Sequence, residues 1–444
     1  MTWKTHLRNA AIIVLVLLIG FGWHLLTPDK AKVALKDMQG PVPKLTPPRR
    51  ENFPTINIAK LVGWQGDAKP VAAPGLKVTS FADKLDHPRW LFELPNGDVL
   101  VAESSAPDRP IKGVEDWIAR KLIMEAGGAG GSPDRITLLR DADGDGVAEF
   151  RSELLTGLRS PFGMALVGTT LYVGNTNALM AFPFTVGETK ITAKGTKLMD
   201  LPASHPNNHW ARNVVADPGG KSLYITVGSN SNIAEGGMAR EKDRALIRQY
   251  DLKTRESLVF AYGLRNANGL AFNPISGTLW TVVNERDMLG SDGPPDYLTT
   301  ADFGTFYGWP FYYWGGIEDR RVPQLRPDLK QYTKRPDYAL GPHVAALGLA
   351  FNTGAALGAS YANGAFVGMH GSWNRSPASG YKVAFIPFNE RGFPTGAKPV
   401  DVLTGFLDAK GKAQGRPVGV ILDRKGALLV ADDAGNRVWR VTAK

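Results

Sequence analysis

The sequence predicts an all-β protein, a six-bladed β-propeller that follows an N-terminal transmembrane helix. One phrase recurs along the chain of 444 residues: a small residue, a few apolar residues, a turn, and a strand of alternating apolar residues. Its copies lie about 50 to 80 residues apart, which suits a four-stranded sheet with a variable insertion, and no long helical pattern separates them. Sheets of this kind arranged radially form a propeller, whose edges are short and protected. The six copies begin at Arg89, Phe162, Arg212, Asn268, Leu347 and Val418.

The N-terminal segment, residues 1–27, has the features of a membrane anchor. Lys4 and Arg8 precede the apolar run AAIIVLVLLIGFGWHLL at residues 10–26, whose length is at the short end of the membrane-spanning range. Positive charge before such a run keeps the N-terminus in the cytoplasm, so we expect a single-pass inner-membrane protein whose main domain faces the periplasm. A cleaved signal peptide is the alternative, although no small-x-small cleavage site follows closely.

Two further segments complete the predicted organisation. Residues 28–70 are expected to be a linker, because GPVPKLTPPRRENFP at residues 40–54 is typical of a stiff proline-rich spacer. Residues 71–444 form the propeller domain, whose last strand, NRVWRV, ends close to the C-terminus, so we expect the ring to close there. Within this domain, GVEDWIARKLIMEAGG from Gly113 predicts a short amphipathic helix ended by glycines, and its apolar residues are expected to pack on the propeller rim rather than touch a membrane.

Composition limits the function classes. Hydrophobic residues make up 43% and charged residues 21% of the chain, as in ordinary globular proteins, and 50 glycines and 31 prolines indicate many turns. The net charge is +10, but the basic residues are spread along the chain without an aromatic and basic nucleic-acid motif, so no nucleic-acid partner is expected. The chain has no cysteine, which excludes disulfides, iron–sulfur clusters with cysteine ligands and thiolate zinc sites.

Polar residues before the innermost strands are the candidates for a functional site, because the loops that lead into these strands line the central channel of a propeller. His209 stands in such a loop and is a candidate general base, since an imidazole titrates near neutral pH. A structural role is the alternative for His209. The sequence is compatible with two roles for His343, in a substrate pocket or in a structural turn. The candidates are His209, Arg212, Arg265, Asn266, His343 and Arg416.

Two acidic segments bear on metal binding. The stretch from residue 282 to 310 is dense in Asp, Glu, Gly and Pro after a strand ends, which suits a hard cation bound by carboxylates and backbone carbonyls, or else a solvated loop. DADGDGVAE at residues 141–149 resembles a calcium loop, but Ser152 stands where an EF-hand needs glutamate, so an Asp-Gly hairpin turn is favoured. The chain contains no nucleotide-binding glycine-rich loop, nucleophile elbow or HExxH helix.

The segments GLRNANGLAFNP, NERDMLGSDGPPDYLT, YGWP, HGSWNRSPASGYKV and GRPVGV together carry a resemblance to a known family. From about residue 75 to 442, the sequence resembles the sugar dehydrogenases that depend on pyrroloquinoline quinone (PQQ), within the glucose/sorbosone dehydrogenase group. The resemblance implies a quinoprotein that oxidises an aldose, sorbosone or a related sugar by hydride transfer to PQQ, with Ca²⁺ as a second cofactor and a membrane quinone or a cytochrome as electron acceptor.

The resemblance also implies roles for individual residues. His209 would be the general base that removes the hydroxyl proton of the sugar. Four residues would bind the cofactor: Arg265 and Asn266 at the quinone edge, Arg416 at a carboxylate, and Arg375 as a weaker match to another such contact. Four residues would bind metal: Glu285 and Arg286 through backbone carbonyls at the calcium that contacts PQQ, and Asp296 and Tyr307 at a second, structural calcium.

The implied chemistry is coherent, because PQQ carries three carboxylates that forked guanidinium donors would neutralise and calcium would polarise the quinone oxygen. The sequence departs from the soluble glucose dehydrogenases at two places. Ser229 and Asn230 stand where those enzymes have a carboxylate that can orient the base, and Val418 replaces a second cofactor arginine, which favours the sorbosone-type branch. Two other functions stay open: a calcium-dependent lactonase in which His209 activates water, and a non-catalytic propeller that binds a partner or a cell-wall polymer.

Overall fold

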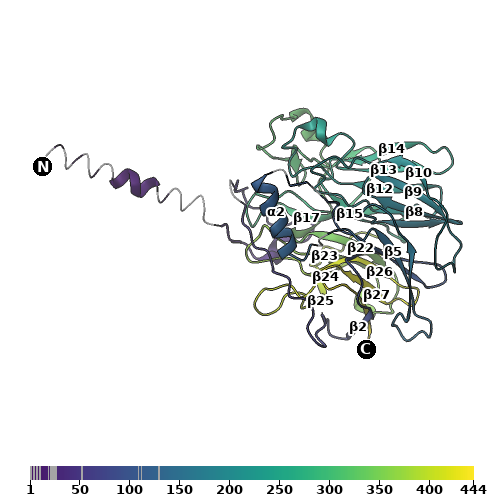
Figure 1. Cartoon of the computed structure of the whole chain (residues 1–444). Coiled ribbons are helices and arrows are strands. Elements are labelled where there is room, and N and C mark those ends of the chain that lie inside the picture. The colour runs from purple at the N-terminus through teal and green to yellow at the C-terminus, as the bar shows by residue number, and fades with distance from the viewer. Residues whose placement is uncertain are drawn as a thin grey trace.

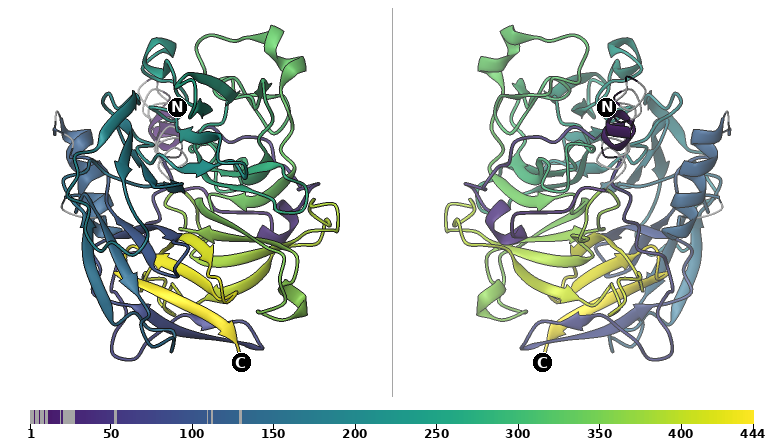
Figure 2. Two further views of the ribbon diagram at one scale, coloured as in Figure 1. Left: turned by 90° about the vertical axis from the view of Figure 1, so that its right-hand side faces the viewer. Right: turned by 90° about the vertical axis from the view of Figure 1, so that its left-hand side faces the viewer.

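The chain folds into a closed ring of six sheets, as the sequence predicts (Figures 1 and 2). This computed structural model describes residues 3, 6, 9, 12–18, 20, 28–51, 54–108, 110, 111, 113–128 and 131–444. Each sheet has four or five strands, and the innermost strands contact one another in sequence around the ring, the last one returning to the first. The all-β six-bladed β-propeller is therefore confirmed.

The strands of each blade follow one another outward from the channel. Blade 1 consists of β3 (Pro88–Glu93), β4 (Val99–Glu103), β5 (Arg135–Arg140) and β6 (Phe150–Leu155); blade 2 of β7 (Met164–Val167), β8 (Thr170–Asn175), β9 (Ala178–Pro183) and β10 (Thr196–Asp200); and blade 3 of β11 (Val214–Ala216), β12 (Ser222–Val227), β13 (Leu246–Asp251), β14 (Ser257–Tyr262) and the added β18 (Thr305–Phe306). Blade 4 consists of β15 (Ala267–Phe272), β16 (Leu279–Val283), β17 (Pro295–Thr300) and β21 (Tyr338–Pro342); blade 5 of β22 (Ala346–Asn352), β23 (Gly364–Met369), β24 (Lys382–Pro387), β25 (Val400–Thr404) and the edge strand β1 (Val71–Ala72); and blade 6 of β26 (Pro417–Leu422), β27 (Leu428–Asp432), β28 (Arg437–Ala443) and β2 (Leu76–Ala82).

The core lies between the blades rather than at the centre of the ring. Six hydrophobic clusters each combine residues of two neighbouring blades, so every sheet is apolar on both faces. The second strands show this best, because every residue of β4, β16 and β27 is buried. Between blades 4 and 5, the fully buried Trp280 contacts the rings of Phe351, Phe388 and Phe393. This two-sided burial explains why the strands are continuous apolar runs.

The two ends of the propeller domain close the ring together. Strand β2 from the N-terminal side of the domain pairs antiparallel with β28, so that Leu76 lies opposite Ala443 (Figure 1). Blade 6 thus takes three strands from the C-terminus and its outermost strand from residues 76–82. Ring closure near the C-terminus agrees with the sequence, but the contribution of β2 carries no repeat signal and was not predicted.

Residues 28–51 and 54–64, which we call the N-terminal strap, pack against the propeller, whereas the sequence predicted a proline-rich spacer over residues 28–70. The strap includes the 3₁₀ helix η1 (Leu35–Met38), whose Met38 is fully buried. Gly40 and Ala339 exchange two backbone hydrogen bonds of 2.9 Å, and Leu61 forms an isolated parallel bridge with Ala413. Prolines keep this segment extended, yet its backbone hydrogen bonds go to the propeller instead of to water.

The predicted helix is present as α2 (Val114–Glu125) in the loop between β4 and β5. Its Trp117 and Ile123 are 55% and 53% exposed, so the expected packing of these two side chains on the rim is wrong.

In the described part of the chain, no helix combines the length and the apolar character needed to cross a bilayer. Of the predicted span at residues 10–26, only residues 12–18 and 20 lie within the described residues. The small elements are η2 (Met238–Glu241), η3 (Pro327–Tyr332), η4 (Ala359–Tyr361) and the hairpin of β19 (Tyr312–Tyr313) with β20 (Ile317–Glu318).

Candidate active site

Strand order places the candidate residues at one end of the ring. In every blade the innermost strand begins and the second strand ends at this end, so two loops from each blade open there. Loops that lead into an innermost strand carry His209, Arg265, Asn266, His343 and Arg416. Loops between the second and third strands carry Glu285, Arg286, His370 and Arg375.

His209 is held in a single tautomer. Its Nδ1 lies 3.0 Å from the carbonyl oxygen of Ser229 and 2.9 Å from the hydroxyl oxygen of the same residue. A carbonyl can only accept, and the Ser229 hydroxyl already donates its proton to the carbonyl of Ser231 at 2.7 Å, so Nδ1 must carry the proton. Burial lowers the pKa of His209 well below its usual value, and the charge of Arg265 lowers it further. Nε2 therefore has a free lone pair and has no hydrogen-bond partner among the described residues.

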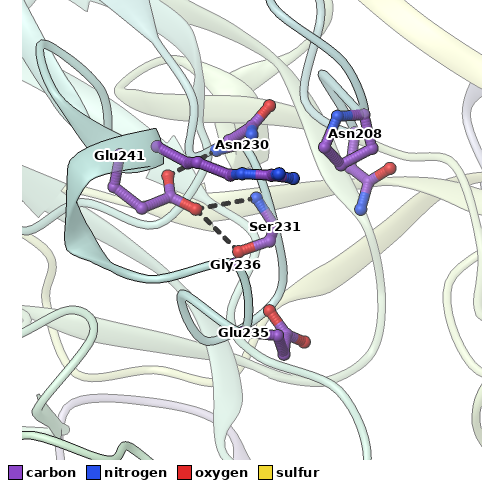
Figure 3. Close-up of a pocket in the computed structure, with 8 residues that line it drawn as sticks. Asn208, Asn230, Ser231, Glu235, Gly236 and Glu241 are labelled. Atoms are coloured by element: carbon purple, nitrogen blue, oxygen red, sulfur yellow. Dashed lines mark hydrogen bonds between the residues drawn. The ribbon is translucent and has the colours of Figure 1, made fainter.

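Glu241 fixes the turn that holds His209 (Figure 3). Its carboxylate accepts hydrogen bonds from the backbone N–H of Asn230 at 2.6 Å and from the N–H and hydroxyl of Ser231 at 3.1 and 2.6 Å. Burial raises the pKa of Glu241, although these hydrogen bonds oppose the rise. The sequence analysis missed this residue, because nothing in a local pattern shows that a carboxylate from a 3₁₀ helix folds back onto the turn. The same residues border a recess of about 280 Å³, lined by Pro206, Asn208, Asn230, Ser231, Glu235, Gly236, Arg240 and Glu241.

Arg265 and Asn266 play different parts. All five N–H groups of Arg265 donate to protein acceptors. These acceptors are the carbonyls of Asn232, Asn284 and Glu285 and the side chains of Asn232 and Asp287, at 2.7 to 3.2 Å. Asn266 instead has a buried Oδ1 without a partner in the described part of the chain. A Cβ on Gly228 would lie 2.5 Å from the Cβ of His209 and 2.6 Å from this Oδ1, so only glycine lets the two residues approach.

The loop after β16 offers oxygen atoms beside Arg265. The carbonyl of Glu285 accepts from Arg265 at 2.7 Å, and one lone pair of that oxygen remains. The Arg286 side chain turns away and is buried against Glu285 at 2.8 Å and Asp319 at 3.3 Å. Burial would raise the pKa of Asp287, but a hydrogen bond from His343 and the charge of Arg265 more than offset it and keep the carboxylate ionised. Carboxylate and carbonyl oxygens are the ligands that Ca²⁺ prefers.

Asp296 and Tyr307, implied as ligands of a second calcium, are not brought together. Asp296 lies at the start of β17, where it accepts from the backbone N–H of Glu285 at 2.8 Å and of Ala345 at 2.7 Å. The hydroxyl of Tyr307 donates to the carbonyl of Thr300 at 2.5 Å, at the other end of the same strand. Four residues along a strand span roughly 13 Å, so the two side chains cannot share one ion. Burial raises the pKa of Asp296 to about 7.

His343 is a structural link in the described molecule. Its Nε2 lies 3.1 Å from the carbonyl of Gly290 and its Nδ1 3.4 Å from the carboxylate of Asp287. Burial would lower its pKa, but the hydrogen bond and charge of Asp287 raise it, so both nitrogens act as donors. Of the two roles that the sequence allows for His343, this geometry favours the structural turn.

The acidic segment at residues 141–149 lies at the opposite end of the ring, between β5 and β6. Ligand atoms of Asp141, Asp143, Asp145 and Glu149 lie within 4.8 Å of one another. Asp141 accepts from the backbone N–H of Gly144 at 2.7 Å and of Gly146 at 3.1 Å, which is the pattern of a tight turn. The segment takes no part in the candidate site.

Arg375 and Arg416 are buried cations with unused donors. Arg375 is 3% exposed and donates from Nη1 to the carbonyl of Pro377 at 2.7 Å, while Asp292 lies 3.9 Å from its Nη2. Arg416 is 6% exposed, donates to the hydroxyl of Tyr381 at 3.1 Å and stacks over the same ring. The Nε of each arginine is buried and has no partner among the described residues. A buried guanidinium group without a full set of acceptors favours binding of an anion.

A further half-buried histidine, His370, was not predicted from the sequence. Its Nε2 lies 3.0 Å from both carboxylate oxygens of Asp433, which also forms an ion pair with Arg89. Burial lowers the pKa of His370 to about 4, although Asp433 opposes this. Burial would raise the pKa of Asp433, but the charges of His370 and Arg89 hold it well below its usual range. Arg89, His370 and Asp433 come from blades 1, 5 and 6, and no local signal in the sequence joins them.

The fold and the site place the protein among six-bladed propellers that have a cationic, histidine-bearing site at one end of the ring. The chain belongs to the TrAA12-like family, whose model matches residues 134–295 and 329–444. This membership confirms the resemblance to the PQQ-dependent sugar dehydrogenases that the motifs indicated.

Known proteins support the family and the fold. The chain is 27% identical over 175 residues to the aldose sugar dehydrogenase YliI of Escherichia coli, covering 36% of this chain and 45% of that protein. It is 25% identical over 289 residues to the PQQ-dependent pyranose dehydrogenase of Coprinopsis cinerea, covering 52% and 39%. The chain thus spans less than two thirds of the length of either relative. The PQQ domain of the Coprinopsis enzyme and a calcium structure of the Trichoderma reesei family AA12 protein superimpose with TM-scores of 0.67 and 0.69, at 19% identity, over 87% of this chain and 100% and 99% of theirs.

Proposed function

We propose that the protein is a PQQ-dependent sugar dehydrogenase in which His209 is the general base. One observation carries the proposal: an imidazole with a fixed Nδ1–H and a free Nε2 lies at the same end of the ring as two buried arginines with unused donors. The substrate is an aldose, sorbosone or a related sugar, and the named relatives are an aldose sugar dehydrogenase and a pyranose dehydrogenase. Ser229 and Asn230 in place of a carboxylate favour a sugar of the sorbosone type over glucose.

The chain's own residues handle the proton. His209 Nε2 accepts the hydroxyl proton of the sugar while Nδ1–H stays bonded to Ser229, so the ring does not have to rotate during the reaction. The Asp287 carboxylate acts on the same ring and favours the imidazolium that forms. Since the pKa of His209 is lowered, the base is unprotonated at neutral pH and ready to accept.

The residues fit an anionic cofactor. When bound, PQQ supplies the acceptor for the two electrons of sugar oxidation. The guanidinium groups of Arg375 and Arg416, each with unused N–H donors, would donate to its carboxylates. The Oδ1 of Asn266 faces the same region as His209. Arg265, which has no unused donor, would act by holding the loop of Glu285 rather than by direct contact.

Calcium is part of the proposal. The backbone carbonyls of Glu285 and Arg286, with the ionised Asp287 nearby, form an oxygen-rich set that suits this ion. We expect chelation by EGTA before PQQ is added to prevent reconstitution, and Ca²⁺ to restore it. Reconstitution that is indifferent to EGTA would remove calcium from the proposal.

Reconstitution is the direct test. Purified apo-protein given PQQ and Ca²⁺ should oxidise a member of a panel of aldoses and sorbosone with an artificial electron acceptor. His209→Ala should still bind PQQ and should lose nearly all turnover. Hydrolysis of lactones without PQQ would support the calcium-dependent lactonase instead, and a protein that takes up no quinone and tolerates His209→Ala would be a non-catalytic propeller.

The cellular setting belongs to the same proposal. The charged and apolar N-terminal segment suits a single-pass anchor in the inner membrane with the propeller in the periplasm. Electrons would then pass to a membrane quinone or a cytochrome. Protease accessibility of the propeller in spheroplasts, together with its recovery in the membrane fraction, tests this placement, and recovery in the cytosol would refute it.

A further inference from the structure

The N-terminal strap contacts two loops, one on blade 4 and one on blade 5, and the second of these carries Arg375. On blade 4 it meets residues 288–292, where the backbone N–H groups of Arg49 and Glu51 donate to Leu289 and Met288 at 3.0 and 3.2 Å. On blade 5 it meets residues 373–376, where the N–H of Ala31 donates to the carbonyl of Ser376 at 2.7 Å. The strap therefore joins two blades at the end of the ring that carries the candidate site.

Arg375 is fixed by the strap at its backbone. The N–H of Asn57 donates to the carbonyl of Trp373 at 2.8 Å, and its side-chain Nδ2 donates to the carbonyl of Arg375 at 2.8 Å. The fully buried Asn374 donates to the Glu51 carboxylate and the Thr55 carbonyl, both at 3.0 Å. Three consecutive residues around the guanidinium group are thus bonded to residues 51–57.

The strap also controls the charge beside Arg375. Asp292 is the acid near this guanidinium, at 3.9 Å, and its other carboxylate oxygen accepts the N–H groups of Lys32 at 2.6 Å and Val33 at 3.1 Å. Backbone donors that stabilise a carboxylate reduce its need for another cation. The strap thus holds Asp292 so that it pairs with Arg375 at 3.9 Å without a hydrogen bond, and N–H groups of Arg375 remain unused.

Arg416 is fixed by the same strap through Asp432. The indole N–H of Trp64 donates to one oxygen of this buried carboxylate at 2.7 Å, and the other oxygen accepts the backbone N–H of Arg416 at 2.7 Å. Trp64 packs edge-on against the rings of Trp439 and Phe406, at 5.3 and 5.6 Å between centroids. Trp64 therefore shares the support of this carboxylate with Trp439, whose indole N–H donates to the same oxygen at 2.9 Å.

We propose that the N-terminal strap positions Arg375 and Arg416, so that the cationic cradle for an anionic cofactor is completed by residues 28–51 and 54–64. This inference rests on the proposed function for the identity of the cofactor, but the positioning of the arginines is a property of the chain itself. Asn57 and Trp64 are positioning residues, since each acts through a neighbour and neither contacts the cofactor. A cradle organised before binding needs less ordering when the ligand arrives, which increases affinity.

The test compares PQQ affinity with turnover. Apo-protein in Ca²⁺ buffer is titrated with PQQ, followed by quinone absorbance, for the wild type, Asn57→Ala and Trp64→Phe, with the exposed neighbour Ile56→Ala as matched control. We expect Kd to rise about tenfold in each of the two variants and about a hundredfold in the double variant, since the two contacts are separate. Ile56→Ala should stay within about twofold. At saturating PQQ, kcat should stay within about twofold of the wild type in all variants, because His209 is untouched.

Several results would overturn the proposal. An unchanged Kd in both variants would refute it, and so would an equal loss of affinity and kcat together with a lower Tm of the apo-protein, since that is a general effect on the fold. Trp64→Phe keeps the aromatic packing and serves as the independent variant if Asn57→Ala does not fold. If the wild type takes up no PQQ, the proposed function fails, and the tricarboxylate citrate then serves as the probe. Citrate should raise the Tm of the wild type more than the Tm of the variants. Equal Tm shifts would refute the positioning role of the strap.

Discussion

His209 and His370 lie at the same end of the ring and are both half-buried, but their partners differ. Nδ1 of His209 is held by the carbonyl and hydroxyl of one neutral residue, Ser229, within a single blade. Nε2 of His370 is held by the carboxylate of Asp433, which is shared with Arg89, so this contact joins three blades. A hydrogen bond to a carboxylate is therefore not by itself the mark of a catalytic histidine. Here the carboxylate also forms an ion pair with Arg89, whereas the partner of His209 is a neutral residue.

Replacing His209 should have the largest effect. In His209→Ala, kcat should fall by about 10³-fold, because a positioned general base contributes on this scale. The measurement is turnover of the reconstituted enzyme at saturating PQQ. His205→Ala, at an exposed position in the same loop, is the matched control and should leave kcat unchanged. Retained turnover in His209→Ala, with loss in His370→Ala, would reverse the comparison.

Asp433 should matter for stability. In Asp433→Asn, the free energy of unfolding should fall by about 3 kcal/mol, because removing one partner of a buried ion pair leaves Arg89 uncompensated. Chemical denaturation of the apo-protein measures this. An exposed ion pair offers the contrast, since Lys197 and Asp200 are both more than half exposed, and Asp200→Asn should change stability by less than about 1 kcal/mol. Equal losses would show that Asp433 is no structural link.

Ser229→Ala should have a smaller effect that sharpens the account of the base. The hydroxyl acceptor is lost, but the carbonyl of residue 229 still fixes Nδ1–H. One lost hydrogen bond is worth about 1 kcal/mol, so kcat should fall about fivefold while the Kd for PQQ stays unchanged. The pH dependence of kcat should also change, because the lost hydroxyl contacts the ring of the proposed base. A fall as large as that of His209→Ala would mean that Ser229 takes part in the chemistry itself.

The smallest effect is expected for kcat in His370→Gln, which should stay within about threefold of the wild type if this histidine is structural. Its signature is pH dependence of stability. The folded pKa of His370 is lowered to about 4 from its usual 6.5, so the unfolded state binds a proton that the folded state does not between these values. Stability is full above about pH 6.5 and falls as pH decreases toward 4. His370→Gln should reduce this slope, and an unchanged slope would assign the proton uptake to other groups.

Much of the fold was predictable, because the repeated phrase marks the innermost strand of each blade. All six copies lie at or beside β3, β7, β11, β15, β22 and β26. Alternation and turn residues are local signals, and a propeller repeats them in every sheet. Closure by β2 and the docking of the N-terminal strap could not be predicted, since both depend on contacts between residues far apart in the sequence, without any period.

The candidate site was predictable only where a motif stood next to an innermost strand, as for His209 and Arg416. Glu241 and Asp433 reach their partners by folding back or by crossing blades, so their roles appear only in three dimensions. Asp296 and Tyr307 show the converse. The family resemblance implied that they share one calcium, yet their hydrogen bonds lie at opposite ends of β17.

Strand β2 has a consequence for synthesis of the protein. Residues 76–82 leave the ribosome long before their partner strand β28 (Arg437–Ala443). The outermost strand of blade 6 must therefore stay unpaired until blades 1 to 5 have been made, and these blades can assemble only into an open arc meanwhile. Arg416 lies just before the last three strands to emerge. A chain that ends before these strands are made would have no complete site to offer a cofactor, which makes cofactor uptake a check on the synthesis of blade 6.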